Sequence, residues 1–145
     1  MKFNQQEINN GKLIYDKLPD KTLSGNVVIK SVYGLEGVAY AKSLNGVFTL
    51  RLSHTENHFG NLYSSNRTVL LKDKTIIPTE TTQESVAMYI TWILHGEDDR
   101  CIWIRKILDS GKLKDKPLVY YKELNEPSHA NALDYLINNW DNLEI

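Results

Sequence analysis

The spacing of apolar residues changes near Thr81, and this change constrains the fold more than any other feature of the sequence. Residues 47–52 divide into two alternating sets, which is the two-residue period of a strand with one face in the core. Within residues 86–94, apolar side chains recur three or four positions apart, as on one face of a helix. We therefore expect strands before this point and mainly helices after it.

Turn signals divide the first region into short strands. Three apolar runs within residues 27–52 are separated by paired glycines and by the dipeptide Asn45-Gly46. A later apolar run, at residues 117–121, lacks strict alternation, as expected for a strand covered on both faces. This pattern predicts an N-terminal antiparallel meander and a central mixed sheet.

Three helices are expected after the change of period, each with its own start signal. Thr81 and Glu84 have the spacing of a capping box ahead of the first helix. Acidic residues 97–99 begin the second helix, which should end at Gly111, and Ser128 is placed to cap the third. The expected fold class is α/β, with α+β as the alternative.

Length and composition indicate one domain. The chain has 145 residues, of which we assign 26–145 to a single globular unit and 1–25 to an arm or short helix. Its 17 Lys and Arg are balanced by 18 Asp and Glu, which argues against general nucleic-acid binding or attraction to a membrane surface. No apolar run approaches the roughly 18 residues of a membrane span, and no signal core is seen, so we expect a cytoplasmic protein.

A polar loop at residues 53–68 is the first candidate site, since loops of this length in compact domains are often functional. His54 and His58 have the spacing of a helical zinc pair, but nothing completes such a site, so we expect neither metal nor cofactor. His58 and Asn61 either contact a ligand or satisfy the backbone of the loop.

The start of the third predicted helix is the second candidate site. A strand that leads into a helix presents free backbone N–H groups and the positive end of the helix dipole to a ligand. His129 could donate to a phosphate or carboxylate there, or exchange a proton. In the alternative reading, Ser128 is only a cap and His129 only packs on the preceding loop.

At these two places the sequence resembles a widespread family of small phage and bacterial domains of unknown function. Family members carry a His-aromatic-Gly-Asn-Pro-aromatic motif after an Arg-bearing strand, an aromatic-Trp-Leu-like run that ends a helix, a Leu-x-Gly-Lys turn, and a Cys-His or Ser-His helix start. The matching stretches, in the same order over roughly residues 47–139, are 49–51, 58–63, 89–94, 111–116 and 128–133.

Two departures from the family pattern bear on the site. Leu62 replaces the usual proline, and Ser128 replaces the cysteine of many members, which excludes thiol chemistry at that position. The resemblance implies a compact α/β domain in which the loop of residues 58–61 approaches the helix start at residues 128–129. Its phage setting suggests an accessory protein that acts on nucleotides or on host defence.

Two functions from different classes follow. The first is a phage-type protein that binds an anionic, nucleotide-like small molecule and sequesters or processes it as counter-defence. Whether it is an enzyme is left open, because no activated nucleophile is identifiable. The alternative is a phage protein that inhibits a host protein by direct contact, through the meander or a hairpin at residues 70–77; a homo-oligomer is also possible. The predicted ligand-binding residues are Arg51, His58, Asn61, Arg67, Tyr121, Ser128 and His129.

Overall fold

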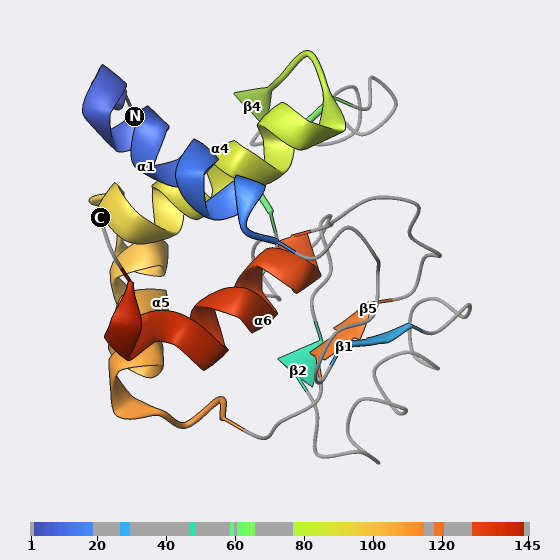
Figure 1. Ribbon diagram of the computed structural model, residues 1–145, viewed down its shortest axis with the longest axis vertical. Helices are drawn as coiled ribbons and strands as arrows, with labels where there is room; N and C mark the ends of the chain where they lie inside the picture. The colour runs from blue at the N-terminus through green and yellow to red at the C-terminus, as the bar shows by residue number, and fades with distance from the viewer. Residues whose placement is uncertain are drawn as a thin grey trace.

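Helices dominate the computed structural model, which describes residues 2–18, 27–29, 47–48, 59, 61–65, 77–114, 118–120 and 129–143 (Figure 1). Four α-helices account for most of these residues, and a short 3-10 helix, η1 (Trp140–Asn142), follows the last of them. The helices are α1 (Gln5–Asp16), α4 (Thr82–His95), α5 (Asp99–Ser110) and α6 (His129–Asn139). The predicted α/β class, like its α+β alternative, is therefore wrong, because the described part of the chain is mostly helical.

Every described strand is two or three residues long. The strands are β1 (Val27–Ile29), β2 (Val47–Phe48), β3 (Tyr63–Ser64), β4 (Ile77–Pro78) and β5 (Leu118–Tyr120). β5 lies between β1 and β2 and pairs with both in parallel, and β3 pairs in parallel with β4. The predicted antiparallel meander and central mixed sheet are thus wrong for these residues. A turn motif in the sequence predicts only that the chain reverses locally. It does not predict the pairing of β1 and β2 with β5, which lies far along the chain.

The three predicted C-terminal helices are confirmed as α4, α5 and α6, and side-chain caps explain where α4 and α5 begin, whereas Ser128, the predicted cap of α6, lies outside the described residues. Thr81 accepts a hydrogen bond from the Glu84 amide (3.0 Å) at the start of α4. The Glu84 carboxylate accepts from the Glu80 amide (3.1 Å), so the predicted capping box is only half formed. Asp98 caps α5, and Gly111 ends it in the left-handed conformation with φ of 70°.

Within residues 1–25, for which an arm or short helix was expected, the structure has the helix α1. Asn4 and Glu7 form a reciprocal capping box, with hydrogen bonds of 2.9 Å and 3.0 Å between side chains and backbone amides. α1 buries Gly11 and Ile14 against α4, across which it lies in Figure 1. A Cβ atom on Gly11 would collide with Thr91, so the two helices approach closely at this point.

α4 is the centre of the hydrophobic core. It contacts α1, α5 and α6, and its Ile90 and Ile93 are fully buried. From α6, Leu133 and Leu136 are also fully buried, while β1 and β5 lie beside that helix. Among the described helices, none is both long enough and apolar enough to cross a membrane.

Candidate functional site

The structure describes two of the seven predicted ligand-binding residues. Asn61 and His129 are placed, and both side chains are completely buried. Outside the described residues lie the other five, which are Arg51, His58, Arg67, Tyr121 and Ser128. Their roles in a nucleotide pocket stay predictions.

The Asn61 side chain fastens its loop to α4. Its Nδ2 donates to Ser85 Oγ (3.0 Å), and its Oδ1 accepts from the Tyr63 amide (2.9 Å). Ser85 Oγ in turn donates to the Tyr63 carbonyl (2.8 Å), which closes a buried polar network. Since buried amides are costly when unpaired, this network satisfies backbone groups that would otherwise destabilise the fold. It matches the alternative in which Asn61 serves the loop's own backbone.

His129 is the first residue of α6 and packs against Tyr89 of α4. The two ring centroids are 5.5 Å apart in an edge-on arrangement. Tyr89 also donates its hydroxyl to the Phe59 carbonyl (2.6 Å), and burial raises the pKa of this phenol. Tyr89 therefore stays protonated and links the loop at Phe59 to the start of α6, two regions that the family resemblance places near each other.

A polar cluster at the turn between α4 and α5 has a structural explanation. Trp92 Nε1 donates to Asp98 Oδ2 (2.6 Å), and the Arg100 guanidinium lies 4.6 Å from the centre of the Trp92 ring. Burial raises the pKa of Asp98, but hydrogen bonds from Trp92 and from the Cys101 side chain and backbone outweigh that effect and lower it overall. Arg105 donates to two carbonyls at the end of α4, those of Ile93 (2.9 Å) and Gly96 (2.6 Å).

The cysteine in this cluster is not an activated nucleophile. Cys101 is fully buried, and its Sγ donates to the Asp98 carbonyl (3.3 Å). Burial and the neighbouring Asp98 carboxylate raise the pKa of the thiol, which disfavours the reactive thiolate. In the part of the chain that the structure describes, no cluster of three metal-ligating side chains occurs.

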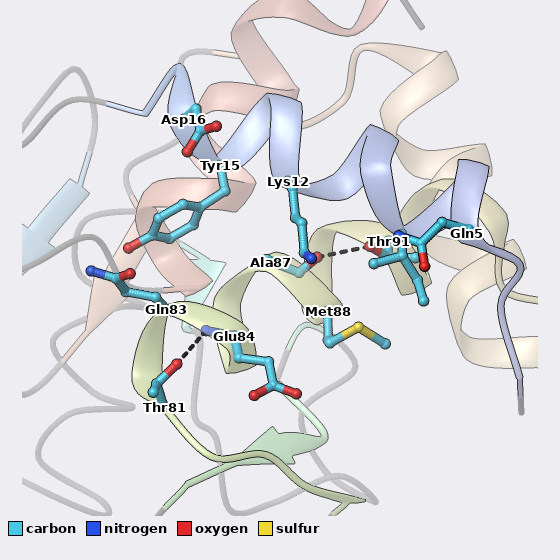
Figure 2. A pocket seen from close by; sticks show the side chains of 11 residues that line it. Gln5, Lys12, Tyr15, Asp16, Thr81, Gln83, Glu84, Ala87, Met88 and Thr91 are labelled. Atoms are coloured by element: carbon cyan, nitrogen blue, oxygen red, sulfur yellow. Dashed lines mark hydrogen bonds between the residues drawn. The ribbon is translucent and has the colours of Figure 1, made fainter.

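A groove of about 590 Å³ runs between α1 and α4 (Figure 2). The helices lie side by side, with Gln5 and Thr91 at one end of the groove and Tyr15 and Gln83 at the other. From α1 the lining residues are Gln5, Ile8, Lys12, Tyr15 and Asp16. From α4 and its cap they are Thr81, Gln83, Glu84, Ala87, Met88 and Thr91.

The groove lining contains both apolar and charged side chains. Ile8 and Met88 are half-buried apolar side chains, whereas Asp16 on α1 and Glu84 on α4 are exposed carboxylates that lie on opposite sides of the groove in Figure 2. Lys12 is the single cation of the lining and extends from α1 in the middle of the groove. The lining thus combines apolar contact with charged and hydrogen-bonding groups, which is the composition of a ligand-binding site.

Sequence reasoning assigned no role to the residues of α1, and so missed this groove. The capping pair Asn4 and Glu7 was a readable signal for the start of the helix. Gly11 within that helix was a second signal, because a helical glycine often marks close packing. Neither signal names the helix against which α1 packs.

No protein-family model, no curated protein and no solved structure matches the chain. The resemblance to the phage and bacterial family therefore stays a prediction.

Proposed function

We propose that this protein is a binding protein that holds an extended segment of a partner protein in the groove between α1 and α4. The observation that carries the proposal is the groove itself. Its volume of about 590 Å³ falls within the roughly 300–1,000 Å³ of ordinary ligand sites. It is open along two packed helices, which suits a chain segment that lies between them.

The mixture of side chains in the groove supports a peptide segment. Ile8 and Met88 offer apolar contact, and methionine adapts its shape to different partners. Gln5, Gln83 and Thr81 offer hydrogen-bonding groups to backbone amides and carbonyls. Apolar anchors with a polar rim are the usual composition of a protein interface.

Direct contact with another protein was the alternative hypothesis from the sequence, there placed on the meander or on a hairpin at residues 70–77. Of that hairpin only Ile77 is described, where it starts β4. The nucleotide-binding hypothesis stays a prediction, since five of its seven predicted ligand-binding residues lie outside the residues that the structure describes. The groove lining does not favour an anionic ligand, because it contains one lysine, Lys12, and two carboxylates, those of Asp16 and Glu84.

A peptide selection tests the proposal. A displayed library of random peptides is selected on immobilised protein, and the recovered peptides are titrated by fluorescence anisotropy. Lys12→Trp places an indole in the middle of the groove and should weaken binding at least tenfold. Lys106→Trp, at an exposed position on α5 away from the groove, is the matched control and should leave binding unchanged.

The outcome is decided by the difference between the two variants. Equal binding to both would show that the peptides use another surface, and a selection that enriches nothing would count against a peptide-binding role. Urea denaturation of each variant checks that the fold is intact, because an exposed lysine in a helix tolerates aromatic replacement at a cost of only a few tenths of a kcal/mol, roughly the difference in helix propensity.

A further inference from the structure

We propose that α1 opens as a separate unit while the rest of the fold stays intact, and that a partner segment binds only when α1 is docked. α1 forms one wall of the groove, so the groove exists only while this helix lies on α4 (Figure 2). The coupling to a partner segment rests on the proposed function and would regulate that site. The opening of α1 does not depend on it.

The packing of α1 is one-sided. Among the described helices and strands, α4 is the element on which α1 packs, and Figure 1 shows α1 lying across it. α4 also packs on α5, α6 and β3. Ile90, Ile104 and Leu136, one from each of α4, α5 and α6, are fully buried in the same hydrophobic cluster. Release of α1 would therefore leave the packing of these three helices in place.

α1 contributes little apolar surface to the core. Of its 12 residues the buried ones are Asn10, Gly11 and Ile14, and among these Ile14 alone has a large apolar side chain. Leu18, just after the helix, is also buried. In α4, by contrast, eight of 14 residues are buried. Since apolar burial is the main favourable contribution to folding, releasing α1 should require less free energy than unfolding the whole protein.

α1 also has little helical stability of its own. Asn9, Asn10 and Gly11 follow one another in its middle, and all three have low helix propensity. A helix of this length is marginal in water even when its sequence favours helix. The capping box of Asn4 and Glu7 stabilises its first turn. Once released from α4, the helix should therefore unfold and expose its backbone amides to water.

Two polar contacts join the N-terminal half of α1 to α4, and both involve His95. Asn10 Nδ2 lies 3.2 Å from His95 Nε2, and Glu7 Oε2 lies 3.7 Å from His95 Nδ1. The ion-pair side chains keep contact with water, with 28% of Glu7 and 22% of His95 exposed. Pairs that remain accessible to water contribute little to stability. These contacts orient α1 on α4 without making up for its small apolar contact.

Native-state hydrogen exchange, followed by mass spectrometry on the wild-type protein, tests the opening. After correction for intrinsic rates, we expect the amides of α1 to exchange about 100-fold faster than the slowest amides of α4 and α6. Their exchange should also depend less on urea, because a partial opening exposes less surface than global unfolding. Exchange of α1 and α4 at one rate and with one urea dependence would overturn the inference.

Two matched substitutions show which contacts persist when α1 opens. Ile14→Val should speed exchange of both α1 and α4 about fivefold, because the contacts of Ile14 are lost in the partial opening and in global unfolding. Ile104→Val, at a fully buried position on α5, should speed exchange of α4 about fivefold and leave α1 unchanged. If Ile104→Val accelerated α1 as much as α4, α1 would open only with the whole protein.

The peptides recovered in the selection above test the coupling. A peptide at 100 times its Kd should slow exchange of α1 about 100-fold, because it binds only the docked state. A peptide that slows exchange of α4 but not of α1 binds a surface that persists when α1 opens. If Lys12→Trp weakens the binding of such a peptide, the inference is overturned and the proposed function stands.

The opposite failure is also recognisable. If no recovered peptide depends on the groove, the proposed function is wrong and the coupling is wrong with it. The separate opening of α1 is then decided by the exchange of the free protein and of its two isoleucine variants, which involve no peptide.

Discussion

Replacing Gly11 by alanine tests whether α1 and α4 approach as closely as the structure indicates. A Cβ atom at this position would collide with Thr91 Oγ1 and would lie 2.8 Å from the Ala87 carbonyl oxygen. Neither neighbour yields easily, since one is a fully buried side chain and the other is helix backbone. The helices would have to separate, and the groove between them would change with them.

Two opposing effects set the magnitude of this change. Alanine is favoured over glycine in a helix interior by about 0.5–1 kcal/mol. Overpacking a close contact costs about 1–3 kcal/mol. Because the overlap at Gly11 involves a backbone oxygen, we expect overpacking to outweigh helix propensity. The free energy of unfolding should fall by about 1–2 kcal/mol.

Urea denaturation followed by circular dichroism measures this loss. In a double-mutant cycle, Thr91→Ala removes the colliding oxygen and should recover about 1 kcal/mol of the cost of Gly11→Ala. Asn9→Ala, at an exposed position on α1, is the matched control; its gain of about 0.5 kcal/mol in helix propensity is partly offset by loss of the hydrogen bond from Gln5 Nε2 to Asn9 Oδ1, so it should stabilise slightly. If Gly11→Ala stabilised the protein as Asn9→Ala does, the close approach of the two helices would be refuted.

Two further predictions concern the loop beside α4. Asn61→Ala should lower the free energy of unfolding by about 2 kcal/mol, because it leaves the buried Tyr63 amide and Ser85 hydroxyl short of a partner; an equal effect from the exposed Asn138→Ala would contradict this role. Burial, with the charges of nearby groups, raises the pKa of Tyr63 to about 12. The unfolded phenol, with its ordinary pKa of about 10, loses its proton first. Stability should therefore fall from about pH 10 to about pH 12. Tyr63→Phe should reduce that fall in pH-dependent denaturation, whereas Tyr135→Phe should not.

The helices could be predicted because their signals are local. Thr81 and Asp98 accept hydrogen bonds from amides three residues ahead, and Gly111 adopts the backbone angles that end a helix. Such contacts depend on neighbours within one turn of the chain. The same logic applies to Asn4 and Glu7, whose capping pattern is present in the sequence although only an arm or short helix was expected there.

The strands and the candidate site could not be predicted in the same way. The partner of β1 and β2 is β5, which lies about 70 or more residues further along the chain, and no local pattern encodes that pairing. Asn61 and His129 have side chains suited to ligands, but burial assigns Asn61 to a hydrogen-bond network with Ser85 and His129 to a ring contact with Tyr89. Residue type indicates what a side chain is able to do, whereas burial decides what it contacts.

By itself the sequence determined where α4 and α5 begin and where α5 ends, that a single cysteine excludes an internal disulfide, and that no general basic surface is required. Only the tertiary structure decided that α1 packs on α4 at Gly11, and so which side chains face each other across the groove. The physical reason is distance along the chain. Caps and periodicity act over one or two turns, but Asp16 and Glu84 border one groove only because two helices far apart in sequence bury their apolar faces together.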